Sequence, residues 1–177
     1  MRVITGSARG RRLKEPKGLD TRPTTDMVKE AVFSMIQYDI EGRRALDLFA
    51  GTGQLGIEAL SRGAAEVVFV DESSAAVRLV KENLAVCGFN SRVEQTDSLA
   101  FLERCGSFDL IFIDPPYDSD LIDKALAIIQ NIDILTQGGI IICESRRDKL
   151  MPEASLPYAM LSQRRYGKVM ITLYGKS

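Results

Sequence analysis

The chain has 177 residues, of which 45% are hydrophobic, and its 23 Lys and Arg side chains nearly balance its 24 Asp and Glu. This length suits one domain and is too short for two ordinary ones. Because the sequence contains no His, nucleophilic schemes with a His base and His-ligated metals are excluded, and we expect no metal. The three cysteines are expected to be buried thiols of a cytoplasmic protein, and no apolar run approaches the roughly 20 residues of a membrane span.

The N-terminal segment is strongly basic although the whole chain is close to neutral. Residues 1–22 carry seven basic and two acidic side chains, a net charge of +5, so the remaining residues carry −6. A basic arm on an acidic body is expected when one edge contacts a polyanion such as RNA; a solvated, flexible terminus would show the same pattern. The candidate RNA-binding side chains are Arg9, Arg11, Arg12, Lys14 and Arg22.

The first 38 residues predict a small extension before a main domain at residues 39–177. Glycines separate two short strand-like stretches, and apolar residues further on recur at three- and four-residue steps, as in an amphipathic helix. Either Thr25 or Asp26 can cap the start of that helix. The predicted elements of the extension are a hairpin of residues 2–5 with 11–14 and a helix over 24–37.

From Gly42 onward, predicted strands alternate with predicted helices. The strands are continuous apolar runs, which is typical of a parallel sheet covered by helices on both faces. We therefore expect an α/β, Rossmann-like fold with a doubly wound, mostly parallel, seven-stranded sheet. The parallel strands are expected at 45–49, 66–71, 92–96, 108–114 and 139–144. The helices are expected at about 53–62, 73–87, 98–104 and 119–131, and a closing antiparallel hairpin at 156–165 and 168–174.

The first of these strands leads into a complete G-x-G-x-x-G pattern at residues 51–56. Asp71 follows Gly51 by 20 residues, at the end of the second strand, where a carboxylate can bind two ribose hydroxyls. The glycines let the backbone turn sharply and approach a ligand closely. Taken alone, this pattern fits a nicotinamide dinucleotide as well as any other adenosine-containing cofactor.

Two features favour S-adenosylmethionine over a dinucleotide. The Asp47 carboxylate beside the loop would repel a pyrophosphate and attract an ammonium group. Hydride chemistry also needs an acid–base partner, and the chain has neither His nor a Tyr followed by Lys at the four-residue spacing. At the end of the third strand, Asp97 with Ser98 can reach the adenine, and Asp97 is equally an ordinary helix cap.

The fourth strand ends in the tetrad Asp114-Pro115-Pro116-Tyr117, which predicts the catalytic group. If this strand lies beside the first, its end is about 5 Å from the glycine-loop strand. The Asp114 carboxylate and the Pro115 carbonyl can then each accept one N–H of a nucleobase amine and direct its lone pair at a methyl group. The prolines hold the backbone extended, and the Tyr117 ring offers a surface on which a base can stack.

The order of these motifs resembles class I S-adenosylmethionine-dependent methyltransferases that act on exocyclic amines. The opening R-V-I-T-G-S-A-R-G-R-R-L and the later G-L-D-T-R-P-T-T-D-M-V-K-E-A-V-F are similar to the bacterial 16S ribosomal RNA guanine-N2 methyltransferase D family, and the likeness extends to the G-K-V-M-I-T-L-Y ending. That family acts on one guanine of the small subunit, preferentially in the protein-loaded particle. The tetrad alone would serve adenine N6, cytosine N4 or guanine N2, so the target base depends on this resemblance.

The resemblance also implies a role for each matching residue. It assigns catalysis to Asp114 through Tyr117, ribose binding to Asp71 and adenine binding to Asp97, with S-adenosylhomocysteine as product. It places the R-P-T-T segment over the cofactor, and Thr52 stands where many relatives have Ser. The full set of candidate cofactor residues is Asp47, Phe49, Ala50, Gly51, Thr52, Gly53, Asp71, Asp97, Ser98, Thr24 and Thr25.

Three other functions stay open on the residues alone. They are a methyltransferase on DNA or small-molecule amines, a nicotinamide-dependent oxidoreductase, and a non-catalytic RNA-binding assembly factor. No long apolar surface pattern is visible in the sequence, so we expect a monomer.

Overall fold

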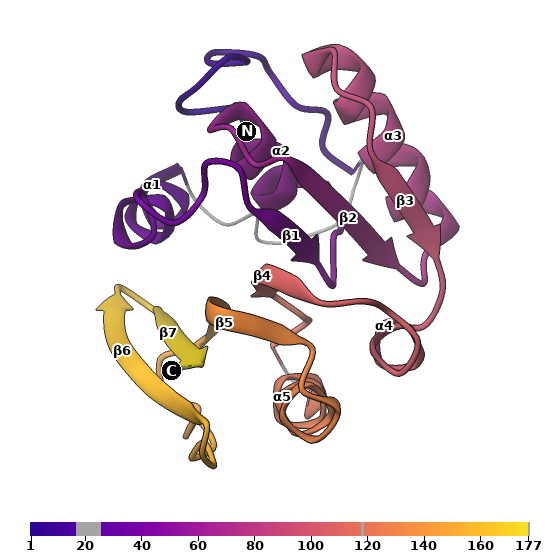
Figure 1. Ribbon diagram of the computed structural model, residues 1–177. Helices are drawn as coiled ribbons and strands as arrows, with labels where there is room; N and C mark the ends of the chain where they lie inside the picture. Colours follow the sequence, from indigo (N-terminus) through magenta and orange to yellow (C-terminus); the bar gives the residue numbers. More distant parts are fainter. Residues whose placement is uncertain (17–25, 118, 177) are drawn as a thin grey trace.

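The computed structural model describes residues 1–16, 26–117 and 119–176, which contain one mixed sheet with helices on both faces (Figure 1). The helices are α1 (Asp26–Met35), α2 (Gln54–Ser61), α3 (Ser74–Cys87), α4 (Ser98–Leu102) and α5 (Leu121–Ile132). The strands are β1 (Arg44–Asp47), β2 (Glu66–Asp71), β3 (Arg92–Gln95), β4 (Phe108–Ile113), β5 (Leu135–Arg146), β6 (Tyr158–Tyr166) and β7 (Val169–Lys176).

The sheet has the strand order β3-β2-β1-β4-β5-β7-β6 in the described part of the chain. Strands β1 to β5 are parallel to one another, whereas β7 is antiparallel to both β5 and β6, which confirms the predicted doubly wound sheet and closing hairpin. Asp47 of β1 is paired with Phe69 of β2 on one side and with Phe112 of β4 on the other. The predicted adjacency of the first and fourth strands is therefore correct, and the chain reverses direction across the sheet between them.

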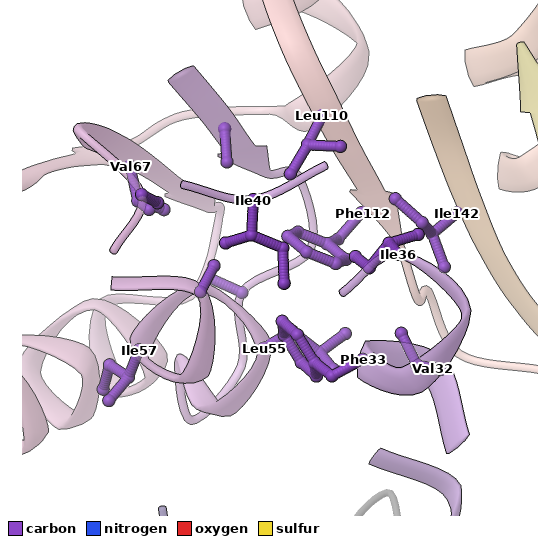
Figure 2. Close-up of a cluster of buried hydrophobic side chains, with 14 of the residues drawn as sticks. Val32, Phe33, Ile36, Ile40, Leu55, Ile57, Val67, Leu110, Phe112 and Ile142 are labelled. Atoms are coloured by element: carbon purple, nitrogen blue, oxygen red, sulfur yellow. The ribbon is translucent and has the colours of Figure 1, made fainter. Parts of the chain in front are cut away.

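Side chains of the central strands alternate between two buried clusters. In β4, Leu110 and Phe112 belong to the cluster that contains residues of α1, α2 and α3, whereas Ile111 and Ile113 belong to the cluster with α4 and α5. This alternation is why both faces of each strand are apolar. In the first cluster, the Phe33 ring of α1 lies 5.7 Å from the Phe112 ring, centroid to centroid (Figure 2).

The predicted N-terminal hairpin of residues 2–5 with 11–14 is confirmed in part: residues 1–3 pair with residues 10–13 through three backbone hydrogen bonds and the bridge between Arg2 and Arg12, and the pairing does not extend to Ile4 and Thr5. The physical reason lies in α2. The backbone N–H groups of Ile4 and Thr5 donate to the Glu58 carboxylate at 2.8 and 3.0 Å instead of to a facing strand. This pairing could not be read from local sequence because more than 50 residues separate the partners.

The N-terminal arm, residues 1–16, is held to α2 by a buried ionic group. The side chains of Lys29 and Glu58 are fully buried, 3.7 Å apart between Nζ and Oε2, and Arg62 Nε donates to Glu58 at 2.9 Å. Burial lowers the pKa of Lys29, and the adjacent Glu58 opposes that shift. At Gly6, with φ of +85°, a Cβ would lie 1.7 Å from the Ser61 carbonyl oxygen, so only glycine allows this close approach.

Strand β5 is longer than the predicted 139–144 because two neighbours extend it. Phe108 of β4 pairs with Leu135 at its start, and Val169 of β7 pairs with Arg146 at its end. The helices α2, α3, α4 and α5 lie within two residues of their predicted bounds. Among residues 1–16, 26–117 and 119–176, no helix has the combined length and apolarity that a bilayer crossing requires.

Candidate active site

One cavity of about 430 Å³ opens at the carboxyl ends of the parallel strands and joins the two predicted halves of the site. This edge of a doubly wound sheet is where ligands bind, and the volume is within the range of small-molecule sites. A tetrad at another edge of the sheet could not act on a ligand held by the glycine loop. The cavity is lined by Phe49, Gly51, Asp71, Glu72, Asp97, Ser98, Leu99, Asp114, Pro115, Pro116, Tyr117, Leu121 and Glu144.

The glycine loop has the geometry that its spacing predicts. Gly51 and Gly53 have φ of +54° and +77°, in the left-handed region that favours glycine. A Cβ at Gly56 would lie 2.3 Å from the Phe69 ring, so the third glycine lets α2 pack closely on β2. The loop therefore turns sharply at the end of β1 and presents Gly51 without a side chain to the cavity.

Asp71 is half-buried at the end of β2 and fixes the loop from the side. Its carboxylate accepts the N–H of Gly51 and the N–H of Ser73, both at 2.9 Å. Because an ionised carboxylate has about four lone-pair sites, these two bonds leave it able to accept ligand hydroxyls. Asp71 therefore lines the cavity at the end of the second strand, and its binding of a ribose stays a prediction.

Asp97 caps a helix and also lines the cavity, so its predicted contact with the adenine is compatible with its role as a cap. Its carboxylate accepts the N–H of Ala100 at 2.7 Å, which caps α4, and the residue also lines the cavity. The hydroxyl of the next residue, Ser98, is buried and donates to the Leu48 carbonyl at 2.6 Å. This bond ties the start of α4 to the segment that follows β1.

Asp47 lies below the glycine loop and is not among the described residues that line the cavity. It is 2% exposed, and its carboxylate accepts the N–H of Gly56 in the first turn of α2 at 2.9 Å. Burial raises its pKa to about 7, the Gly56 N–H opposes the shift, and the Asp71 carboxylate adds to it. Its direct contact with a cofactor stays a prediction.

Other predicted loop residues shape the backbone and do not line the cavity. The carbonyl of Thr52 accepts an N–H from the Asn83 side chain at 2.9 Å, and its hydroxyl lies 3.4 Å from the Met1 sulfur. Asn83 also exchanges two hydrogen bonds with the backbone of Lys14. Ala50 and Gly53 are buried and joined by a backbone hydrogen bond. The N-terminal arm thus braces the glycine loop through Asn83.

The tetrad begins directly after β4 and faces the same cavity as the loop. Pro115 is buried, Pro116 is exposed, and Asp114 and Tyr117 are half-buried. The Tyr117 hydroxyl donates to Glu144 Oε1 at 2.7 Å. The structure therefore brings the predicted catalytic residues together with several of the predicted cofactor-binding residues in one cavity.

Glu144 of β5 was missed by the sequence reasoning. It is 5% exposed and lines the cavity beside the tetrad. Its signal in the sequence is the one that marked Asp71 and Asp114, a carboxylate directly after a buried apolar strand run. Finding its partner required the strand register, in which Ile113 of β4 faces Cys143 of β5.

The predicted RNA-binding residues lie apart from the tetrad where the structure describes them. Arg9, Arg11 and Arg12 are exposed on the N-terminal arm, whose turn contacts the last residue of α2, and the Lys14 ammonium pairs with Glu82 of α3 at 2.9 Å. The predicted residues Arg22, Thr24 and Thr25 lie outside the described residues. A second basic surface adjoins the tetrad, in a hollow lined by Tyr117, Arg146, Arg147, Asp148 and Lys168. We call this second surface the mouth patch.

Comparison with known proteins gives near full-length matches. Residues 1–175 match a protein family described as "Conserved hypothetical protein 95". The chain is 41% identical to YlbH of Bacillus subtilis (strain 168) over 182 residues, which cover 99% of each chain. It is 32% identical to the Escherichia coli (strain K12) protein named "Ribosomal RNA small subunit methyltransferase D" over 176 residues, 98% of this chain and 89% of that one. The solved structure of YhhF from Escherichia coli superposes with a TM-score of 0.89 at 32% identity, covering 100% of this chain and 98% of that chain.

Proposed function

The chain belongs to the family described as Conserved hypothetical protein 95 and has the fold of class I methyltransferases, and from this premise we propose that it methylates 16S ribosomal RNA at the exocyclic N2 amine of a guanine, with S-adenosylmethionine as methyl donor. The observation that carries the proposal is the single cavity shared by Asp71 and the tetrad. The relatives' name, ribosomal RNA small subunit methyltransferase D, supports the RNA as substrate. The guanine N2 position follows from the motif resemblance.

The residues present fit this cofactor better than a dinucleotide. Asp71 can accept the ribose hydroxyls, Asp97 and Leu99 lie where an adenine ring can bind, and Gly51 leaves room for the backbone to approach the ligand. Five carboxylates, all in one cavity, oppose a pyrophosphate and favour a cation. They belong to Asp71, Glu72, Asp97, Asp114 and Glu144. S-adenosylmethionine, when bound, supplies a methyl group on a positively charged sulfur and leaves as S-adenosylhomocysteine.

The tetrad supplies the orientation that a poor nucleophile needs. An exocyclic amine is weakly nucleophilic because its lone pair is delocalised into the ring. Asp114 and the Pro115 carbonyl each accept one N–H, which turns the lone pair toward the methyl carbon. As the new C–N bond forms and the C–S bond breaks, the nitrogen becomes acidic and gives up one proton, which the Asp114 carboxylate is placed to accept. The Tyr117 ring holds the base by stacking.

A folded RNA also needs cationic protein surface around the reacting base. The mouth patch lies beside Tyr117 and can bind phosphates next to the target nucleotide, and the N-terminal arm can contact a more distant part of the particle. We propose that the enzyme acts as a monomer in the cytoplasm, on the small subunit or an assembly intermediate. No metal takes part in this scheme.

The test uses small subunits from a bacterial strain that lacks this gene. The purified protein should form N2-methylguanosine in their 16S RNA, identified by mass spectrometry of digested nucleosides. Asp114→Ala should reduce methyl transfer by at least about 1,000-fold, because the amine loses its main orienting acceptor, while S-adenosylhomocysteine affinity stays within about twofold. Unchanged turnover in Asp114→Ala would refute the tetrad's role. Methylation of adenine or of a competing DNA duplex instead would refute the substrate.

A further inference from the structure

We propose that Glu144 is the residue that selects guanine, by accepting the N–H at ring position N1 while the N2 amine is held by Asp114. This inference rests on the proposed function and adds a specificity determinant to it. The tetrad by itself accepts any of three base amines, so selection requires another group in contact with the ring.

The position of Glu144 in the sheet is what places it against the base. Ile113 and Cys143 are paired in neighbouring parallel strands, so Asp114 and Glu144, the next residue of each chain segment, hold corresponding positions. Neighbouring strands are about 4.8 Å apart. Both residues line the same cavity, and Glu144 is 5% exposed. Two carboxylates therefore reach one end of the cavity from adjacent strands.

The chemistry of the three base amines differs at the ring nitrogen beside the amine. In adenine and cytosine the one ring nitrogen beside the amine carries a lone pair, whereas guanine has an N–H at N1 on one side of its N2 amine and a lone pair at N3 on the other. An ionised carboxylate only accepts hydrogen bonds. With the amine at Asp114, Glu144 therefore bonds guanine and opposes the lone pair of adenine or cytosine. A site that pairs a substrate N–H rejects analogues that lack it much more strongly than an apolar pocket does.

Tyr117 contacts this carboxylate. Its hydroxyl donates to Glu144 Oε1 at 2.7 Å. A carboxylate has room for further donors beside this one, because its two oxygens offer about four lone-pair sites. The stacking residue and the selecting residue are thus connected, and a base that stacks on Tyr117 meets Glu144 along its edge.

The test compares guanine with 2-aminopurine, which has the same N2 amine and no hydrogen at N1. Small subunits are reconstituted with 16S RNA that carries one or the other base at the nucleotide that the wild-type protein modifies. The wild-type protein should prefer guanine by at least about 100-fold in kcat/KM. In Glu144→Gln, the amide oxygen still accepts from Tyr117 and the NH₂ group donates to the bare N1. The preference should therefore shift toward 2-aminopurine by at least about 100-fold relative to the wild type.

One further variant separates base reading from a structural role. Tyr117→Phe removes the hydrogen bond to Glu144 and keeps the carboxylate, so its preference for guanine should stay. Equal use of both RNAs by the wild-type protein would overturn the inference without any variant. So would a Glu144→Gln variant that loses activity on both RNAs in the same proportion. If the wild-type protein forms no N2-methylguanosine at all, the proposed function fails, and this inference fails with it.

Discussion

The pH dependence of ligand affinity tests whether Asp47 contacts the cofactor. Its carboxylate is buried below the glycine loop, and burial raises its pKa from 3.8 to about 7, against the opposing hydrogen bond from Gly56. If the cofactor's ammonium group lies beside Asp47, as the sequence predicts, the ligand binds the ionised carboxylate. Binding then releases the Asp47 proton at any pH below about 7.

The size of the effect follows from the shift. A change from 3.8 to about 7 corresponds to about 4 kcal/mol between the two protonation states. The pKa of Asp47 is higher in the folded protein than in the unfolded chain. Its protonated form therefore contributes to the free energy of unfolding in full below pH 4, and this contribution is lost as the pH rises through about 7. For a ligand that needs the ionised form, affinity should level off above about pH 8. It should fall about 10-fold at pH 6 and about 100-fold at pH 5.

Calorimetric titration with S-adenosylhomocysteine between pH 5 and pH 7.5 measures this dependence. In that range the ligand's own amino group stays protonated. Buffers with different ionisation enthalpies report the number of protons released. Asp47→Asn is the matched control, since its amide oxygen can still accept from Gly56 and it cannot ionise. Its affinity should be flat with pH, and its apoprotein should be more stable than the wild type at pH 8.

Two results would refute this reasoning. A wild-type affinity that does not change between pH 5 and pH 7.5 would show that no cation meets Asp47. An Asp47→Asn variant with the wild-type pH profile would assign the titration to another group. Either result would limit Asp47 to supporting the start of α2.

The remaining predictions concern the base and the RNA. Tyr117→Phe keeps the stacking surface and loses one hydrogen bond, so kcat/KM should fall by no more than about fivefold. Tyr117→Ala loses the stacking surface as well, and its kcat/KM should fall about 10- to 100-fold. Equal losses in the two variants would show that the hydroxyl, and not the ring, is what the reaction needs. The slope of log affinity against log salt, measured with small subunits, reports the number of phosphate contacts. Replacing Arg147 and Lys168 of the mouth patch with Gln should reduce this slope by about 1.4 to 1.8. Replacing Arg9, Arg11 and Arg12 with Gln should reduce it by about 2 to 3. The control replaces the exposed Arg78 and Lys81 of α3 with Gln and should leave the slope unchanged. If a test variant also leaves the slope unchanged, the surface that it alters does not contact the RNA.

The fold could be predicted largely from sequence because its signals are local. Apolar strand runs, the glycine spacing and the carboxylates at strand ends each lie within a few residues, and they fix the strands and one edge of the sheet. The register between β4 and β5 is not local. The position of Glu144 beside Asp114 follows only from the pairing of Cys143 with Ile113.

Two contacts could not be read from local sequence, and both have the same physical origin. The N-terminal hairpin stops pairing after Val3 because Glu58, distant in sequence, takes the N–H groups of Ile4 and Thr5. Asp47 is predicted to attract the cofactor's ammonium group, and the structure shows that its carboxylate also accepts the Gly56 N–H inside the protein. In each case a buried carboxylate satisfies backbone donors, which strand and helix patterns do not reveal.

The order of the strands explains why the four carboxylates of the candidate site lie near one another. In the strand order β2-β1-β4-β5 (Figure 1), Asp71 and Asp47 are the last residues of β2 and β1. Asp114 follows β4 directly, and Glu144 holds the corresponding position in β5, two residues before the end of that strand. The proposed ligands present a matching row of donors: ribose hydroxyls, an ammonium group, an exocyclic amine and a ring N–H. In the proposed scheme each acceptor meets a different donor, because the four carboxylates belong to residues of four neighbouring strands or to the residue directly after one. A substitution at one position should impair one recognition step and leave the others in place, which is why affinity, turnover and base preference are measured separately.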